Sequence, residues 1–274
     1  MKNLVILKNK IKKFDKKISV TGDKSISIRW VLLSSLAKGV SKAQNLLISE
    51  DVLAAIEAIK KLGIKVSFKN ETCKIYGVGI DGYRYKKNLT LDAKNSGTLG
   101  RLLLGLLINT HVPVKLIGDK SLSKRDFKRV ADPLSRFGAK FKLHKNKYLP
   151  LTITGSKNLN PFKYFEKRGS AQCKTAVIFG GMRTNGTTCI KSKKSRNHTE
   201  LLCKYLNLPI TLKNNKKNDI ITIKKVEKIN PLNYRIPSDI SSSAFFIVLT
   251  ALSKNSKLVI KNVNINPSRI GIIT

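Results

Sequence analysis

This sequence contains few residues of the kinds that bind metals or form disulfide bridges. Its four cysteines are widely separated and include no C-x-x-C pair, and its three histidines show no spacing typical of metal ligands. A disulfide framework and a zinc site are therefore poorly supported. We expect no bound metal, and reduced, mostly buried thiols such as cytoplasmic proteins contain.

Long apolar segments are also missing. The first ten residues, M-K-N-L-V-I-L-K-N-K, are too short and too interrupted for a signal peptide, and the apolar run from Leu102 to Ile108 directly follows Arg101. Neither segment is long enough to cross a bilayer. We therefore expect a soluble, cytoplasmic protein with no membrane partner.

Acidic residues are scarce, because 16 of them stand against 54 lysines and arginines and give a formal net charge of +38. Such a balance normally suggests a nucleic-acid partner. The lysines are scattered, however, and aromatic residues make up only 7%, which is little for a base-stacking surface. We favour a lysine-rich composition with an electropositive cleft for small anions. A basic fragment that binds nucleic acid or other polyanions stays as an alternative.

The stretch from Gly22 to Leu36 is typical of a strand-to-helix corner. Its glycine permits a sharp turn, polar side chains can cap the helix start, and an apolar run follows. Free amides at such a start favour an anion, and Lys24 adds a positive charge. Ser25 and Arg29 lie one turn apart on the same face, so both can reach one ligand. The corner predicts a phosphate or carboxylate site, although an ordinary capped helix would have the same pattern.

Similar corners recur along the chain. Ser25, Ser96, Ser170 and Ser241 follow one another at intervals of 71, 74 and 71 residues. Each unit reads as strand, helix, strand, helix, strand, strand, and so long a period indicates repeated supersecondary units. With 41% hydrophobic residues, the chain can bury a substantial core. The predicted fold class is α/β.

The repeats also predict the domain organisation. Residues 21–234 form a three-unit domain, residues 1–20 supply one or more N-terminal strands to a second domain, and residues 235–274 form the incomplete start of that second domain. The stretch P-L-N-Y-R-I-P is expected to be an extended hinge. Because the fourth unit stops at Thr274, short of the period, we expect a fragment with an unpaired sheet edge.

A second basic corner, G-D-K-S-L-S-K-R, closely resembles the first. Lys120, Lys124 and Arg125 cluster at a predicted helix start, where the helix dipole disfavours cations. This conflict with a local preference suggests an anion-binding function.

Six motifs together resemble one family. They are G-D-K-S-I-S-I-R, L-D-A-K-N-S-G-T-L-G-R, G-D-K-S-L-S-K-R, G-S-A-Q-C-K-T-A, S-R-N-H-T-E, and I-P-S-D-I-S-S-S-A-F-F with V-N-I-N-P-S-R. In order and coverage they are similar to the EPSP synthase (3-phosphoshikimate 1-carboxyvinyltransferase) family. The resemblance implies two domains of three β-α-β-α-β-β units, an inside-out α/β barrel arrangement, and a site between the domains.

The resemblance also implies the chemistry. The family transfers the enolpyruvyl group of phosphoenolpyruvate to the 5-hydroxyl of shikimate 3-phosphate, a step of the shikimate pathway to chorismate and aromatic amino acids. It uses no metal or organic cofactor, and its members are commonly monomers. Because both substrates are anionic, several fixed cations must offset their charge.

Matched position by position, the resemblance implies two sets of binding residues. The set for shikimate 3-phosphate is Lys24, Ser25, Arg29, Ser170, Ala171, Gln172 and Ser195. The set for phosphoenolpyruvate is Lys24, Asn95, Gly97, Thr98, Arg125 and Gln172. Lys24 is also implied as catalytic, Ser96 belongs to the phosphoenolpyruvate loop, and Arg196 is a further phosphate contact. A side chain at Gly97 would crowd the ligand.

The family's catalytic acid and base groups are not found in these residues. They belong to D-E-L-P-like and K-E-S-D-R motifs, neither of which occurs here, although protonation of the enol carbon needs such groups. Asp239 is expected at a helix cap or on the cleft wall. Smaller departures from the family pattern are Asp126, Asn197 and Gly169. We expect this polypeptide alone to lack appreciable activity while retaining weak shikimate 3-phosphate affinity.

Two alternatives stay open. UDP-N-acetylglucosamine enolpyruvyl transferases share the architecture, but their first corner has an N-K-N-A type of sequence and they need a loop cysteine, which the region from Lys120 to Arg125 lacks. A polyanion-binding fragment would lose its binding steeply on addition of salt. Within the favoured family, Gly97 is compatible with glyphosate entering the phosphoenolpyruvate site.

Overall fold

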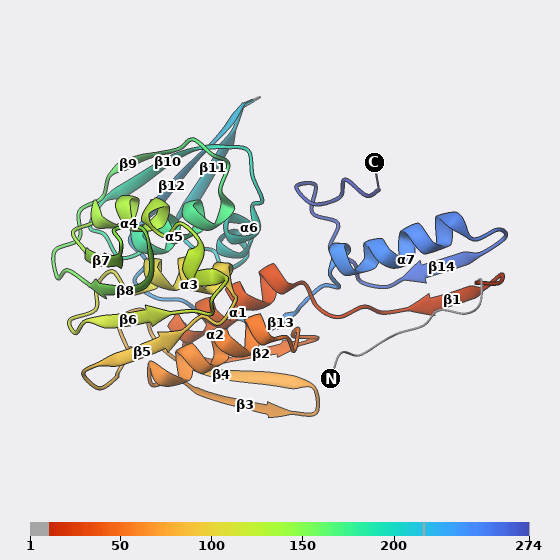
Figure 1. Cartoon of the computed structure of the whole chain (residues 1–274), viewed down its shortest axis with the longest axis horizontal. Coiled ribbons are helices and arrows are strands. Elements are labelled where there is room, and N and C mark those ends of the chain that lie inside the picture. Colours follow the sequence, from red (N-terminus) through yellow and green to blue (C-terminus); the bar gives the residue numbers. More distant parts are fainter. Residues whose placement is uncertain (1–10, 216, 274) are drawn as a thin grey trace.

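The repeating units form three four-stranded sheets (Figure 1). The computed structural model describes residues 11–215 and 217–273, so the strand expected at L-V-I-L lies outside the described residues. The strand order of the first sheet is β13 (Tyr234–Arg235), β2 (Lys38–Gln44), β4 (Thr72–Val78) and β3 (Lys65–Lys69). That of the second sheet is β5 (Leu89–Asp92), β6 (Val114–Ile117), β8 (Tyr148–Thr154) and β7 (Lys140–His144). That of the third sheet is β9 (Lys163–Glu166), β10 (Thr187–Lys193), β12 (Asn218–Lys224) and β11 (Ile210–Asn214).

The three sheets share one pairing pattern. In each, the first two strands named run parallel and the other neighbours run antiparallel. In the second and third sheets a helix joins the two parallel strands, and in every unit the last two strands form a hairpin. The helices are α1 (Lys24–Leu36) and α2 (Glu50–Lys61), α3 (Gly97–Leu106) and α4 (Lys128–Ser135), and α5 (Ala171–Gly181) and α6 (His198–Tyr205). The predicted α/β class and its repeating unit are confirmed.

The first sheet takes its leading strand from the stretch predicted as a hinge. β13 pairs in parallel with the end of β2. The segment before α1 pairs instead with the segment before α7 (Ile240–Leu252). The amide of Asp23 donates to the carbonyl of Pro237 over 2.8 Å, and the amide of Asp239 donates to that of Thr21 over 3.0 Å. These two crossing segments place the starts of α1 and α7 side by side.

The first helix of each unit lies at the centre of the molecule. α1, α3 and α5 lie between the sheets (Figure 1), and nearly all of their residues are buried. Such helices are apolar on several sides, as is typical of helices enclosed by protein. α3 and α5 approach closely at Gly105, where an added Cβ would lie 2.2 Å from the carbonyl oxygen of Ala176.

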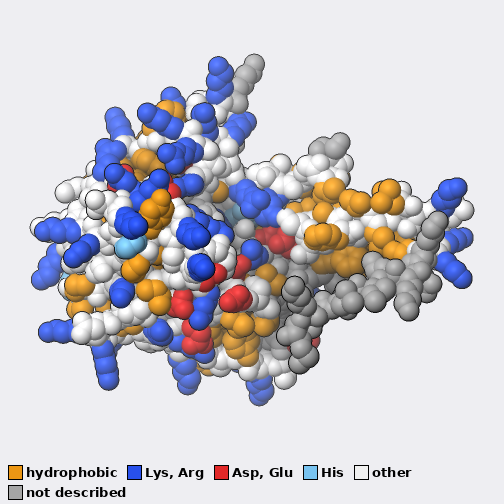
Figure 2. All heavy atoms as spheres, in the orientation of Figure 1, with side chains coloured by type: hydrophobic (Ala, Val, Ile, Leu, Met, Phe, Trp, Pro, Cys, Tyr) orange, Lys and Arg blue, Asp and Glu red, His pale blue; other side chains and the backbone are white. Residues whose placement is uncertain are grey.

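The last described part of the chain extends away from this core (Figure 1). β14 (Lys257–Ile260) pairs in parallel with β1 (Asp15–Ile18), and α7 packs on β14. Only two residues of α7 are buried, although the helix is rich in apolar side chains, and Phe245 and Leu252 are 79% and 80% exposed. Figure 2 shows the resulting apolar surface along α7.

No sheet closes into a barrel within the described residues. The inside-out barrel implied by the resemblance takes the form of three separate sheets around central helices, because hydrogen bonding in each sheet stops at its edge strands. None of the helices in this part of the chain is both long and apolar enough to cross a membrane.

Candidate functional site

Three capped helix starts provide the framework of the site. The side chains of Asp23, Ser96 and Ser170 accept hydrogen bonds from backbone amides of α1, α3 and α5 over 3.0, 3.3 and 3.3 Å. Nε2 of Gln172 donates to the hydroxyl of Thr98 over 3.0 Å. Because these are the second residues of α5 and α3, the two helix starts meet, and their free amides favour an anion.

A cavity of about 770 Å³ lies beside the start of α5. Ser170, Ala171 and Gln172 line it, and so do Ser195 and Arg196, which precede α6. We call it the serine cavity. The hydroxyl oxygen of Ser195 is buried and has no hydrogen-bond partner among the described residues, so its bonding capacity is unused. Four residues predicted for shikimate 3-phosphate therefore share this cavity.

Arg129 of α4 also lines the serine cavity, although sequence reasoning did not single it out. Its Nη2 donates to the hydroxyl of Ser170 over 2.7 Å, and its Nε contacts the sulfur of Cys173 at 3.4 Å. The contact with Cys173 raises the pKa of the guanidinium. A carboxylate oxygen of Glu166 accepts from the amide of Ser170 over 2.6 Å. Ser170 is thus held between a cation and a carboxylate.

The loop before α3 gathers residues predicted for phosphoenolpyruvate. Nη2 of Arg125 donates to Oδ1 of Asn95 over 3.2 Å, and Nδ2 of Asn95 donates to Asp119 over 2.6 Å. A Cβ added to Gly97 would lie 2.8 Å from Nη1 of Arg101 and 3.2 Å from Nη1 of Arg125. Two guanidiniums therefore flank this glycine, an arrangement that suits a carboxylate or phosphate ligand.

Arg101 links this loop to the serine cavity. Its Nη1 donates to the carbonyl of Gly97 over 3.2 Å and to Oε1 of Gln172 over 2.7 Å. The guanidinium is buried against the ring of Phe127, and burial lowers its pKa. The sequence contained one signal for this role: Arg101 interrupts the apolar run L-G-R-L-L-L, and a charge on a buried helix needs specific partners.

Arg29 is buried beneath the start of α1. Only 3% of it is exposed, and it donates to the carbonyl of Ser25 and to the hydroxyls of Thr175 and Thr199 over 2.9, 3.3 and 2.7 Å. Burial lowers its pKa to about 10. Since each nitrogen already has a partner within the protein, the ligand that Ser25 and Arg29 would share stays a prediction.

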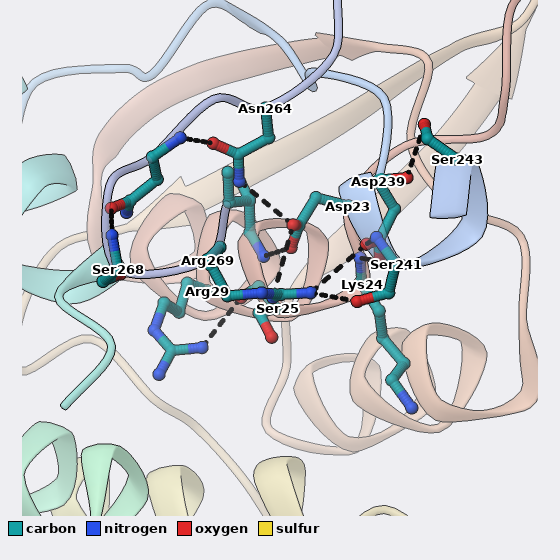
Figure 3. Close-up of polar contacts among 12 residues, drawn as sticks. Asp23, Lys24, Ser25, Arg29, Asp239, Ser241, Ser243, Asn264, Ser268 and Arg269 are labelled. Atoms are coloured by element: carbon teal, nitrogen blue, oxygen red, sulfur yellow. Dashed lines mark hydrogen bonds and ion pairs between the residues drawn. The ribbon is translucent and has the colours of Figure 1, made fainter. Parts of the chain in front are cut away.

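The ammonium of Lys24 is engaged with an acidic residue of α2. Its ammonium forms a 2.8 Å ion pair with Asp51 of α2, and Figure 3 shows its side chain directed away from Arg29. Its backbone amide donates to Asp239, the N-cap of α7, over 3.3 Å. Because its ammonium pairs with Asp51 rather than with another predicted site residue, its role with both substrates stays a prediction.

The segment V-N-I-N-P-S-R returns to the start of α1 (Figure 3). Arg269 forms ion pairs with Asp23 at 3.6 Å and with Asp239 at 3.4 Å. Asn266 donates to Asn197 over 2.8 Å. The segment therefore bridges two helix caps and the loop beside the serine cavity, a long-range role that the motif alone did not reveal.

The basic corner around Lys120 is not the start of an α-helix. It contains one turn of 3-10 helix, η1 (Leu122–Lys124), and α4 begins only at Lys128. The predicted conflict with a helix dipole is therefore wrong. The cations of this corner line a hollow of about 620 Å³ beside Arg125.

Thiols and imidazoles form no candidate metal centre in the described part of the chain. No group of three or more His, Cys, Asp and Glu side chains there is arranged to hold an ion. All four cysteines are free, and burial raises the pKa of Cys73 to about 12. Cys73 is therefore a poor nucleophile near neutral pH.

His198 predicts a dependence of stability on pH. Its ring is buried without a hydrogen-bond partner among the described residues, and burial, reinforced by Arg29, lowers its pKa to about 3. Because the unfolded chain binds this proton near pH 6.5, the stabilisation is complete above that pH and is lost as pH falls towards 3. Between about pH 7 and about pH 5 the free energy of unfolding should fall by about 2 kcal/mol more than in His198→Gln. Urea unfolding at both pH values measures this difference. An equal change in the free energy of unfolding for the two proteins would contradict it.

The repeated α/β units place guanidiniums around capped helix starts. This arrangement is typical of proteins that bind small, multiply charged anions. The particular family follows from comparison with known proteins. The chain belongs to the EPSP synthase (3-phosphoshikimate 1-carboxyvinyltransferase) family, whose model matches residues 8–274. The family predicted from the six motifs is thereby confirmed.

Relatives and solved structures agree with this assignment. The 3-phosphoshikimate 1-carboxyvinyltransferase of Caldicellulosiruptor bescii is 42% identical over 265 residues, which are 96% of this chain and 60% of the relative. That of Leuconostoc mesenteroides is 38% identical over 93% of this chain and 58% of the relative. EPSP synthase from Acinetobacter baumannii superposes with a TM-score of 0.88 at 34% identity, over 96% of this chain and 58% of that one. The chain thus spans about three fifths of the length of these relatives.

Proposed function

We propose that these residues form the substrate-binding part of a 3-phosphoshikimate 1-carboxyvinyltransferase. The complete reaction moves the enolpyruvyl group of phosphoenolpyruvate to the 5-hydroxyl of shikimate 3-phosphate and releases phosphate. The observation that carries the proposal is the link from the guanidinium-flanked Gly97 to the serine cavity through Arg101 and Gln172. This link supports two adjacent anion sites, as a reaction between two anionic substrates requires.

The serine cavity is the proposed shikimate 3-phosphate site. Ser170, Gln172 and Ser195 offer hydroxyl and amide groups to the phosphate, Ala171 lines the same wall, and Arg129 supplies the nearby charge. Lys24, Ser25 and Arg29 are assigned to this substrate by the resemblance. The unused hydroxyl of Ser195 supports the choice of this cavity.

The loop before α3 is the proposed phosphoenolpyruvate site. Asn95, Gly97 and Thr98 form its backbone wall, and Arg125 supplies a planar pair of donors for a carboxylate or phosphate. Gln172 contacts Thr98, so it lies where both ligands would meet. Lys24 is proposed to reach this ligand after leaving its ion pair with Asp51.

Turnover requires polypeptide beyond these residues. Residues 21–234 form the first domain in this proposal, and residues 1–20 and 235–274 begin a second domain that carries the acid and base groups. The exposed apolar surface of α7 supports this division, because such a surface is normally covered. By family, the complete protein is a cytoplasmic monomer.

Titration calorimetry tests the proposed substrate site. We expect saturable one-to-one binding of shikimate 3-phosphate, and weaker binding of shikimate because the phosphate contacts are lost. Arg129→Gln should weaken the affinity at least about tenfold, since its charge-assisted bond beside the phosphate disappears. Arg136→Gln is the matched control, because Arg136 contacts Phe162 and the carbonyl of Lys163 rather than the cavity.

Two further titrations separate the rival functions. UDP-N-acetylglucosamine should not bind, because the first corner has the G-D-K-S pattern. Single-stranded DNA should bind only at low salt, as expected for nonspecific attraction to a highly basic chain. Tight, salt-resistant DNA binding without shikimate 3-phosphate binding would contradict the proposed function.

A further inference from the structure

A buried ion pair joins α5 and α6. Nζ of Lys174 on α5 and a carboxylate oxygen of Glu200 on α6 are 2.6 Å apart, with side chains 0% and 1% exposed. Lys174 lies one turn after Ser170, and Glu200 lies two residues into α6, close after Ser195. The pair therefore connects the two helices whose preceding corners line the cavity.

The neighbouring residues extend this connection to α1. Thr175 and Thr199, which follow Lys174 and precede Glu200, share a hydrogen bond of 2.7 Å. Both hydroxyls also accept hydrogen bonds from the guanidinium of Arg29. Arg29, Thr175 and Thr199 thus form one hydrogen-bonded group, and the ion pair of Lys174 and Glu200 lies next to it in the chain without a hydrogen bond to it. We call these five side chains the buried layer. It lies beneath the starts of three helices.

The charges of the buried layer do not balance. Arg29 and Lys174 are cations, and Glu200 is the carboxylate within the layer. Burial lowers the pKa of Arg29, and the carboxylate of Glu200 opposes that change. An ion pair at this depth contributes little net stability, because removing two charges from water offsets most of their attraction. Such a pair can instead specify the relative position of the groups it joins, because two buried charges must meet each other.

We propose that Lys174 and Glu200 are positioning residues for the anion site: they hold the corners Ser170–Gln172 and Ser195–Asn197 at the spacing that forms the serine cavity. Displacement of a binding group by about 1 Å weakens its interactions strongly. The identity of the ligand rests on the proposed function, whereas the positioning role does not.

Variants of the pair test this role. Glu200→Gln and Lys174→Met each leave one buried partner alone, whereas the double variant Lys174→Met/Glu200→Met removes both charges and should fold normally. Glu57→Gln/Lys60→Met is the matched control, because that ion pair on α2 is exposed. Shikimate 3-phosphate affinity is measured by calorimetry well below the unfolding midpoint. Amide hydrogen exchange is measured on the same samples without ligand.

We expect the double variant to lose at least about tenfold in affinity and to exchange faster at residues 170–173 and 195–198. Exchange in the second sheet, within residues 89–154, should not change. Lys174→Arg should retain most of the affinity, because it preserves the charge pair. A purely structural pair would instead lower the unfolding midpoint and raise exchange throughout the molecule.

The outcomes distinguish this proposal from the proposed function. Unchanged affinity in a folded double variant would overturn the positioning role. If the unsubstituted chain does not bind shikimate 3-phosphate, the proposed function fails. The exchange data then decide alone: faster exchange confined to the two corners supports positioning, and unchanged exchange at both corners overturns it.

Discussion

Turnover is expected only when these 274 residues are combined with the part of a relative that they do not match. The enzyme of Caldicellulosiruptor bescii is a suitable donor, because it is 42% identical and this chain covers 60% of it. General acid and base groups typically contribute on the order of 10² to 10⁴-fold to rate, and the family motifs that carry them do not occur here. Phosphate release from both substrates should therefore rise at least about 10³-fold over either piece alone.

The apolar surface of α7 provides the control for this complementation. Phe245 and Leu252 are 79% and 80% exposed, so Phe245→Asp and Leu252→Asp should leave the chain folded while blocking association with the added piece. Phe68→Asp, at a residue of β3 that is 48% exposed, should leave complementation intact. Steady-state turnover by the chain alone would contradict the prediction. Complementation that tolerates both α7 substitutions would contradict the proposed role of this surface.

The repeat explains why much of the fold could be predicted. A polar corner followed by an apolar helix recurs at nearly constant intervals, and each of the three complete units also carries the pattern of a hairpin. The three sheets share one strand order, with β13 in the leading place of the first sheet. β13 could not be predicted, because its two residues are too few to show an alternation of apolar and polar side chains.

The candidate site could be predicted less completely, because side-chain direction depends on distant partners. Ser170 and Ser195 precede helices of the same unit, so their common cavity follows from local structure. Arg29 is different. Its partners Thr175 and Thr199 lie 146 and 170 residues away in the sequence, and they draw its guanidinium inward.

Charge in an apolar helix was a signal that sequence reasoning underused. Arg101 interrupts a run of leucines, and in the structure it joins Gly97 to Gln172. Lys174 likewise interrupts an apolar helix and pairs with Glu200. A charged residue on a buried face must find partners, so such positions point to long-range contacts even where the partner cannot be identified. Asp239 was expected at a helix cap or on the cleft wall, and it is the N-cap of α7. A cap could be predicted without knowledge of distant partners, because its hydrogen bond is local.

Gly97→Ala is expected to weaken phosphoenolpyruvate binding at least about tenfold, which corresponds to about 1.4 kcal/mol. The new Cβ would lie 2.8 Å from Nη1 of Arg101 and 3.2 Å from Nη1 of Arg125. At least one guanidinium must therefore move, and a charge-assisted pair of hydrogen bonds to the ligand depends on its placement. Calorimetry with phosphoenolpyruvate in the presence of saturating shikimate 3-phosphate measures the change.

Gly100→Ala is the matched control for crowding in the same helix. Its Cβ would lie 3.1 Å from the ring of Phe127 and would approach no guanidinium directly, so it could affect Arg101 only through that ring. We expect this variant to alter the unfolding midpoint while phosphoenolpyruvate affinity stays within about twofold, because the change remains within the core. If both variants bind the ligand as the unsubstituted chain does, phosphoenolpyruvate does not approach the backbone at Gly97. If both variants lose the same affinity for phosphoenolpyruvate, the cause is altered packing of α3, because of these two glycines only Gly97 lies between the two guanidiniums.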